Sequence, residues 1–185
     1  MNKKRQLLID TALTLFYAKG INHTGINEVL SVSGVAKNTL YNHFESKEAL
    51  IIATLEQRHT LFIEWLTSKL EGADSDQQVI TQLFTALAQW FTHCDPILGD
   101  FRGCFFINSS AEFSDQGGQI SLFCKQHKQQ CRDLIGQSLT NKDASLLDAI
   151  CLMKEGAIST AYVSGDVTIA KKCITLLNIT AKNIN

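Results

Sequence analysis

Apolar residues recur at helical spacing in the first segment of the chain, residues 3–19. The apolar face of this segment is formed by Leu8, Ala12, Leu15 and Phe16, which is the periodicity of an amphipathic helix. Gly20 follows directly, at the position where a helix C-terminus favours glycine. We therefore predict a helix over residues 3–19.

Two short helices and one long helix are predicted next. Thr24 is expected to cap a short helix that ends near Ser33, and residues 34–36 then form a brief connection containing Gly34. A second short helix is predicted over residues 37–43, and a long helix capped by Ser46 over residues 47–70. Two short helices joined by a tight turn that contains glycine are typical of a helix-turn-helix unit.

The remaining sequence predicts longer helices. They are expected over residues 76–93, from about 103 to 117, and over 119–140, 143–164 and 166–182. An irregular loop over 94–102 contains the only proline of the chain. Long segments with few helix-breaking residues predict an all-α fold and argue against a turn-rich β-sandwich.

The composition and the cysteine spacing limit the classes of protein to which this chain can belong. The chain is 45% apolar and 19% charged, and no apolar run approaches the roughly 20 residues of a membrane-spanning helix. The six cysteines lie far apart, without a C-x-x-C pair, so we expect reduced thiols in a cytoplasmic protein. Residues 1–60 carry seven Lys/Arg against five Asp/Glu, a basic excess too small to identify a nucleic-acid-binding protein by itself.

The segment from Leu8 to Leu50 resembles the TetR family of bacterial transcriptional repressors. The family pattern reads apolar-x-x-x-Ala-x-x-Leu-Phe-x-x-x-Gly, then Thr, Gly-Val and Tyr-x-x-Phe-x-x-Lys-x-x-Leu. The matching positions here are Leu8, Ala12, Leu15, Phe16, Gly20, Thr24, Gly34, Val35, Tyr41, Phe44, Lys47 and Leu50. The chain departs from the family at Leu30 and Ser33, where small residues are usual. The resemblance implies an N-terminal three-helix helix-turn-helix domain over 1–46 and a larger helical ligand-binding and dimerisation domain over 47–185.

The resemblance also assigns a DNA-binding role to the second short helix, which would lie in the major groove of double-stranded DNA. Its outward residues are polar and long enough to reach bases or phosphates, as direct recognition requires. The predicted DNA-binding residues are Thr24, Lys37, Asn38, Thr39, Tyr41, Asn42, His43 and Lys47. Among these, Tyr41 and Lys47 resemble the family's phosphate contacts. The basic run Lys3, Lys4 and Arg5 is expected near the flanking DNA. The alternative for residues 37–43 is a solvated helix face, and His43 alternatively packs or caps.

The resemblance further implies a homodimer that reads a palindromic operator, with half-sites about one helical turn apart or somewhat more. The last two predicted helices would pack against their symmetry mates as a four-helix bundle. The predicted interface residues are Leu147, Cys151, Ile158, Tyr162, Ile169, Cys173 and Leu177. These apolar positions alternatively face the core of the same chain, or serve both purposes.

A ligand pocket is implied within the helices of residues 47–164. Aromatic side chains are plentiful there, which suits a small apolar inducer. The residues predicted to sense the inducer are Trp65, Phe84, Cys104, Phe105 and Asn108. The alternative for the aromatic residues is that they form the apolar core.

Cys104 is the candidate for thiol chemistry. It follows Gly103 at a predicted helix start and lies two residues from Arg102, and helix amides and a nearby cation both stabilise a thiolate. Gly-Cys and Ser-Ala-Glu stand at the spacing found in TetR-family sensors of electrophiles and oxidants, which this segment resembles. The alternative is a small buried residue that begins a helix.

Two further interpretations stay open on the residues alone. Cys124, His127 and Cys131 share one helix face and would bind zinc with a fourth ligand, but nothing in the spacing demands it, so no metal or cofactor is expected. A cysteine enzyme would use Cys104 as nucleophile with His93 or His127 as base, although the sequence carries no catalytic signature.

Overall fold

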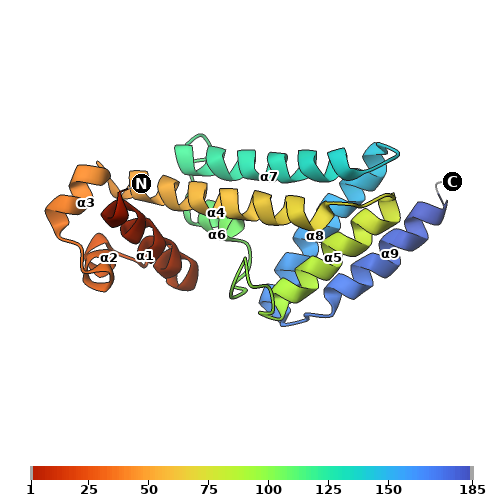
Figure 1. Ribbon diagram of the computed structural model, residues 1–185, viewed down its shortest axis with the longest axis horizontal. Helices are drawn as coiled ribbons and strands as arrows, with labels where there is room; N and C mark the ends of the chain where they lie inside the picture. Colours follow the sequence, from red (N-terminus) through yellow and green to blue (C-terminus); the bar gives the residue numbers. More distant parts are fainter. Residues whose placement is uncertain (1, 184–185) are drawn as a thin grey trace. The chain divides into compact units, whose positions relative to one another are not determined.

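The computed structural model describes residues 2–183, and the side chains of residues 2–179. Every regular element within this described range is a helix, which confirms the all-α prediction. The helices are α1 (Lys3–Lys19), α2 (Ile26–Ser33), α3 (Lys37–His43), α4 (Lys47–Leu70), α5 (Asp76–Phe91), α6 (Phe105–Glu112), α7 (Gln119–Ser138), α8 (Ala144–Ser164) and α9 (Ile169–Asn183) (Figure 1).

Several helix ends agree with the sequence predictions. The helices α1, α3 and α4 begin and end at the predicted residues. Gly20 caps α1, and the hydroxyl of Ser46 accepts a hydrogen bond from the Ala49 amide at the start of α4. The prediction that Thr24 caps α2 is wrong, because Gly25 occupies the N-cap position.

Other helices are shorter than predicted, for local reasons. The helix α5 stops at Phe91, and His93 beyond it adopts a left-handed backbone conformation with φ 59°. The helix α9 begins at Ile169 because Asp166 organises a turn ahead of it. One oxygen of Asp166 accepts bonds from the amide and the hydroxyl of Thr168.

The described chain forms two compact units. Unit 1 comprises Met1–Thr60 and Phe105–His127, and unit 2 comprises Leu61–Cys104 and Lys128–Asn185. This division into compact units differs from the predicted domain boundary after residue 46, which stays a prediction. The first part of α4 and the segment from α6 into α7 pack with the three N-terminal helices in a common unit.

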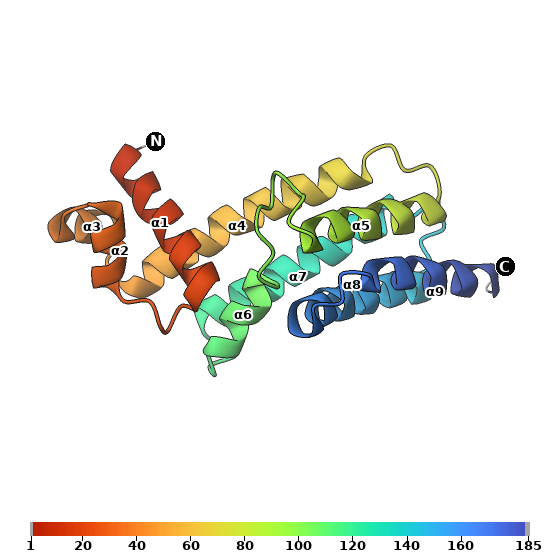
Figure 2. The same ribbon diagram turned by 90° about the horizontal axis from the view of Figure 1, so that it is seen from below.

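The core of unit 1 is built from the apolar faces that the sequence pattern predicted. The helix α1 packs against α2 and α3, as Figure 2 shows. The side chains of Leu8, Phe16, Leu40 and Leu50 are buried at this contact or beside it. Hydrophobic burial of these four residues therefore fixes the two short helices to their support.

In unit 2, α9 lies beside both α5 and α8 and runs antiparallel to them (Figure 1). Its aromatic residues pack edge to face or tilted, the arrangements that aromatic pairs prefer. Trp65, Phe84, Trp90 and Phe91 are almost completely buried, and the ring of Phe101 lies 4.9 Å from that of Trp90.

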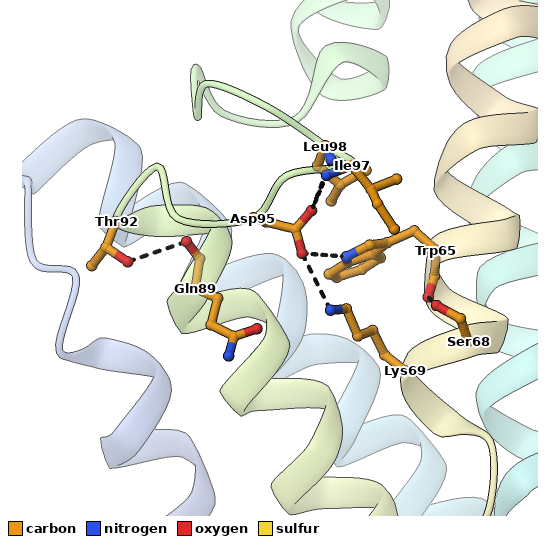
Figure 3. A network of polar contacts seen from close by, with 8 residues as sticks. All are labelled: Trp65, Ser68, Lys69, Gln89, Thr92, Asp95, Ile97 and Leu98. Carbon is orange, nitrogen blue, oxygen red and sulfur yellow. Dashed lines mark hydrogen bonds and ion pairs between the residues drawn. The ribbon is translucent and has the colours of Figure 1, made fainter.

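A buried carboxylate anchors the irregular segment that follows α5. Asp95 is 2% exposed. It accepts hydrogen bonds from the Trp65 indole at 2.8 Å and from the amides of Ile97 and Leu98 at 2.9 and 2.8 Å (Figure 3). Lys69 lies 3.4 Å from the same carboxylate. Burial acts to raise the pKa of Asp95, but these hydrogen bonds and the Lys69 charge together lower it below the ordinary value.

None of the described helices has the combined length and apolar character that crossing a membrane requires.

Candidate functional site

The helix α3 presents a polar face to solvent. Lys37, Asn38, Tyr41 and Asn42 are exposed, and Thr39 and His43 are half-buried. The structure thus brings six of the eight residues predicted to bind DNA onto a single short helix. Because none of these six side chains is fully buried, the face remains open to a partner.

The opposite side of α3 is held by apolar and cation–π contacts. Leu40 and Phe44 are buried in unit 1, and the Arg5 guanidinium lies 5.1 Å from the centre of the Phe44 ring. Arg5 therefore packs against the end of α3, whereas Lys3 and Lys4 beside it are exposed. These contacts fix which side of α3 faces outward.

Thr24 and Lys47, the other two predicted DNA-binding residues, lie elsewhere. Thr24 is fully buried, and its hydroxyl donates to the Gly20 carbonyl at 2.9 Å. The Lys47 ammonium donates to the Ile21 carbonyl at 2.7 Å. Burial lowers the pKa of Lys47, and the negative charge of Glu112 partly opposes this shift. Both side chains therefore stabilise the connection between α1 and α2, and their contact with DNA stays a prediction.

Glu112, at the end of α6, binds the same connection. Its two carboxylate oxygens accept hydrogen bonds from the Ile21 amide at 2.9 Å and the Asn22 amide at 2.6 Å. The Asn22 side-chain amide donates in return to the Glu112 carbonyl at 3.0 Å. We call Glu112, Ile21, Asn22 and Lys47 the Glu112 clamp. Sequence reasoning missed this role, and the only signal was the Ser-Ala-Glu run that contains Glu112.

Gly20 makes the Glu112 clamp possible. Its backbone has φ 90°, a conformation that side-chain-bearing residues rarely adopt, and a Cβ atom there would lie 3.2 Å from a Glu112 carboxylate oxygen. Glycine at this position therefore serves both as the cap of α1 and as the space that admits Glu112.

Cys104 lies at the end of the irregular segment of unit 2, directly before the first residue of α6 in sequence. Its side chain is 7% exposed, and its Sγ lies 3.3 Å from the Lys128 ammonium. Gly103 before it has φ 77°, and a Cβ on that glycine would approach the Tyr162 ring to 3.0 Å. The cation that the structure places beside the sulfur is thus Lys128, whereas the sequence suggested Arg102.

Lys128 belongs to a charged cluster with Glu155 and Lys154. It donates to Glu155 at 2.6 Å, and Lys154 pairs with the same carboxylate. Burial acts to lower the pKa of Lys128, but the sulfur of Cys104 and the carboxylate of Glu155 raise it well above the ordinary value. Lys128 therefore stays positively charged beside Cys104 throughout the physiological pH range.

Burial affects three other cysteines of unit 2. Burial raises the pKa of Cys131 to about 11, and burial also raises the pKa of Cys151 and of Cys173. Since the thiolate is the reactive form, these three thiols are poor nucleophiles at neutral pH.

The other predicted sensing residues are distributed between the two units. Trp65 and Phe84 belong to the packed core of unit 2. Phe105 is buried in unit 1 with its ring 5.8 Å from Tyr17, and Asn108 is half-buried on α6. The burial of these aromatic side chains is therefore consistent with the alternative that they form the apolar core.

The spacing of Cys124, His127 and Cys131 does not produce a metal site in the described part of the chain, where no three potential metal ligands converge. His127 is engaged otherwise. Its ring stacks on Phe106 at 3.4 Å between centroids, and its Nδ1 lies 2.9 Å from Nδ1 of His59.

The residues predicted for a dimer interface differ in exposure. Ile158, Cys173 and Leu177 are buried within the protomer, so for these three the core alternative holds. The half-buried positions are Leu147, Cys151 and Ile169, and Tyr162 is exposed. The structure instead exposes other apolar residues of α8 and α9, namely Leu152, Val163, Leu176 and Ile179.

Comparison with known proteins supplies the family. A family model described as bacterial regulatory proteins of the tetR family matches residues 8–54. The transcriptional repressor NemR of Escherichia coli K12 is 26% identical over 139 residues, which cover 74% of this chain and 67% of NemR. The repressor ComR of the same strain is 29% identical over 136 residues, which cover 70% of this chain and 61% of ComR. The match thus leaves about a third or more of each relative's own length uncovered.

A solved structure shows the same fold over nearly the whole chain. SCO4454, a TetR-family transcriptional regulator from Streptomyces coelicolor, superposes with a TM-score of 0.85 and 21% sequence identity, covering 99% of this chain and 96% of that one. The relatives and this neighbour are transcription regulators and not enzymes. The alternative of a cysteine enzyme is therefore rejected.

The Glu112 clamp predicts the effect of replacing its carboxylate. In Glu112→Gln the side chain keeps one acceptor oxygen, so the Ile21 or Asn22 amide faces an NH₂ group and loses its partner. We expect a loss of about 1–2 kcal/mol in local stability and roughly tenfold faster amide hydrogen exchange at residues 21 and 22. Glu64→Gln, an equivalent change at an exposed position of α4, should leave that exchange unaltered. Equal exchange rates in Glu112→Gln and the wild type would contradict the assigned role.

Proposed function

This chain belongs to the TetR family of bacterial transcriptional regulators, and we propose that it represses by binding a palindromic operator as a homodimer in the cytoplasm. A small apolar ligand or the modification of a thiol would release it from DNA. The observation that carries the proposal is the exposed polar face of α3, formed on a helix whose other side is fixed in the core. A short helix held in this way is the element that helix-turn-helix proteins insert into the major groove.

The residues of α3 divide by the contacts they would make. Asn38 and Asn42 carry amides that pair with base edges, and Asn is suited to adenine. Lys37 and Tyr41 are suited to phosphates, which set register without reading sequence. Thr24 and Lys47 are left out of this set, since their polar groups are bonded to main-chain carbonyls within unit 1.

An exposed apolar stripe supports the homodimer. Leu152, Gly156, Ser159 and Val163 follow each other on one face of α8, and Leu152 and Val163 are 74% and 78% exposed. A Cβ on Gly156 would meet nothing within 4 Å, so a second helix has room to approach. Exposed apolar residues that share one helix face are characteristic of an interface, and α9 also exposes Leu176 and Ile179.

Cys104 supports release by thiol chemistry. Its sulfur is buried beside the permanently charged Lys128, so an added group at Sγ must displace its neighbours. The chain continues from Cys104 directly into α6, whose last residue holds the α1–α2 connection through the Glu112 clamp. A change at Cys104 would therefore act on the support of the DNA-binding helices through α6, the kind of packing shift by which regulators switch. A small apolar ligand would release the protein from DNA through the same contact between α6 and the α1–α2 connection.

The DNA-binding proposal predicts separable effects of two α3 substitutions. After selection of an operator from random duplex DNA, Lys37→Ala should weaken binding to all sequences and reduce the salt slope by about 1. Asn38→Ala should cost about 1–3 kcal/mol and relax specificity at one base pair of each half-site. Fluorescence anisotropy at several salt concentrations measures both effects.

Lys171→Ala, at an exposed position of α9, is the matched control and should bind as the wild type does. The proposal fails if selection enriches no inverted repeat, or if both α3 variants keep wild-type affinity and salt dependence.

The proposed homodimer leads to the prediction that negative charges introduced into the α8 stripe separate the protomers. The double substitution Leu152→Glu and Val163→Glu places two carboxylates in an apolar interface, where their desolvation is unfavourable. We expect a dimer for the wild type and a monomer for the variant in sedimentation velocity, with operator affinity reduced at least a hundredfold. Leu122→Glu, at an exposed apolar position of α7, should remain dimeric. A monomeric wild type would refute this part of the proposal.

The thiol proposal predicts a response specific to Cys104. With N-ethylmaleimide, the Cys104 sulfur forms a bond to an alkene carbon and the neighbouring carbon takes up a proton from water. Stoichiometric treatment at neutral pH should abolish operator binding by the wild type and by Cys94→Ser, whose thiol is exposed, but not by Cys104→Ser. Mass spectrometry locates the adduct. Release that persists in Cys104→Ser would assign the switch to another group.

A further inference from the structure

Two histidines of unit 1 face each other through the same ring atom. His59 lies on α4 and His127 on α7, and their Nδ1 atoms are 2.9 Å apart. This is the distance of a hydrogen bond, and the planes of the two rings meet at an angle of 80°. We call these two residues the histidine pair. Neither the polar face of α3 nor the Cys104 thiol involves it.

One proton fits between the two Nδ1 atoms. A neutral imidazole carries a proton on one nitrogen and a lone pair on the other, so one ring of the pair donates through Nδ1 and the other accepts through Nδ1. A first added proton goes to Nε2 of the donating ring and leaves the hydrogen bond in place, now assisted by charge. A second added proton occupies the accepting Nδ1, and two N–H groups then point at each other. The doubly charged pair is therefore incompatible with this contact.

The surroundings of the histidine pair also disfavour a second charge. His127 is 2% exposed, and its ring stacks on that of Phe106 at 3.4 Å between centroids. The half-buried ring of His59 lies edge to face with Phe123, with the centroids 5.8 Å apart. Removal from water disfavours the charged form of an imidazole. Burial therefore acts in the same direction as the repulsion between the two rings.

The charged residues that adjoin the pair in sequence are cations. Arg58 precedes His59 on α4 and is buried. Lys128 follows His127 on α7 and pairs with Glu155. A nearby like charge disfavours protonation of an imidazole, although Glu155 offsets part of the Lys128 charge.

The other ionisable groups of the three helices that meet at the pair are exposed, are thiols, or bind elsewhere. Glu56 on α4 and Lys125 on α7 are exposed, where solvent and salt screen their charges. The buried thiols of Cys124 and Cys131 lie one turn before and one turn after the histidine of α7. Glu112, the one acidic or basic residue of α6, accepts the amides of the α1–α2 connection. The contact between the two rings thus governs the response to a second proton.

We propose that the histidine pair is an acid-sensitive contact that opens when a second proton binds, and that its opening weakens operator binding. The contact joins α4 to α7 and, through the ring of Phe106, to α6. The first residue of α4 and the last residue of α6 are Lys47 and Glu112, which both belong to the Glu112 clamp. The histidine pair and the clamp therefore depend on the same two helices. The effect on operator binding rests on the proposed function, whereas the acid-sensitive contact does not.

Acid favours the open form because the open form binds more protons. Two separate imidazoles bind two protons below their ordinary pKa of about 6.5, whereas the closed pair binds at most one. The closed form is therefore most stable above this pH and loses stability as the pH falls through it. The population of the open form should rise by up to about tenfold per pH unit in the acid range.

Nuclear magnetic resonance of the ring nitrogens tests the contact in the full chain without DNA. At pH 8 we expect one ring of the pair to carry its proton on Nδ1 and the other to carry its proton on Nε2. The signals lost in His59→Gln assign the two rings. If both rings of the wild type carry their proton on Nε2 at pH 8, no hydrogen bond joins the two Nδ1 atoms and the proposal is overturned.

Hydrogen exchange measures the opening. The protection factors of the α6 amides of residues 109–112 should fall at least about tenfold in the wild type between pH 7.5 and pH 5.5. In His59→Gln the side-chain amide offers both a donor and an acceptor to His127, so the decrease should be less than about threefold. His23→Gln, which replaces an exposed histidine of the same unit, should behave as the wild type does. Equal decreases in the wild type and His59→Gln would refute the acid-sensitive contact.

Operator titration separates the contact from its effect on DNA binding. Between pH 7.5 and pH 5.5 the wild type should lose at least about fivefold more operator affinity than His59→Gln loses. Both proteins have the same α3 residues, including His43, so direct effects of pH on the DNA contacts cancel in this comparison. Opening of the contact with equal losses of affinity would overturn the effect on operator binding. If the chain selects no operator at pH 7.5, the proposed function fails, while the nitrogen spectra and hydrogen exchange still decide the contact.

Discussion

The connection between α1 and α2 depends on a carboxylate supplied from a distant part of the sequence. The α1 helix ends at Gly20, and the amides of Ile21 and Asn22 that follow belong to no helix. Backbone donors of this kind need an acceptor wherever water has restricted access, and Ile21 is almost completely buried. The two oxygens of Glu112 meet this need, and the Lys47 ammonium binds the Ile21 carbonyl on the same peptide segment. The position of the short helices therefore depends on α6 and on the start of α4.

Because of this dependence, the two ends of α6 have different roles: the helix begins next to Cys104 and ends at the residue that holds the α1–α2 connection. Its first residue follows Cys104, whose sulfur lies beside the Lys128 ammonium, and its last residue is the acceptor for the α1–α2 connection. The helix has only eight residues, so a small displacement at its beginning cannot be absorbed along a long flexible segment. The segment before Cys104 is equally constrained, since Asp95 ties its loop to Trp65 and Lys69. The thiol that we propose as the switch therefore lies, in sequence, between two segments that are held by hydrogen bonds.

The local sequence pattern was sufficient to predict the helices of the fold, but it did not predict the hydrogen bonds of the polar side chains inside the protein. The apolar spacing of residues 3–19 and 47–70 and the cap at Ser46 identified two helices with approximately the observed bounds, because helix periodicity and capping act over a few positions. The polar face of α3 was predicted for the same reason.

Thr24 and Lys47 matched a family motif, yet their hydroxyl and ammonium bind main-chain carbonyls inside unit 1, and a motif does not specify the partner of a side chain. Glu112 was missed because its partners lie some ninety residues away. Ile158, Cys173 and Leu177 are buried within the protomer, and the pattern did not separate core from interface positions because both sides of α8 and α9 carry apolar residues.

The Glu112 clamp acts mainly on main-chain atoms, and this has a consequence for how such proteins diversify. Its carboxylate recognises two peptide N–H groups, which every residue except proline provides, and its geometric demand on the loop is a residue without Cβ at position 20. The α3 side chains that face solvent contribute nothing to it. The face of α3 that we propose to read DNA is thus free to accumulate substitutions without any compensating change in the Glu112 clamp. Recognition and control can evolve as separate traits within one small unit.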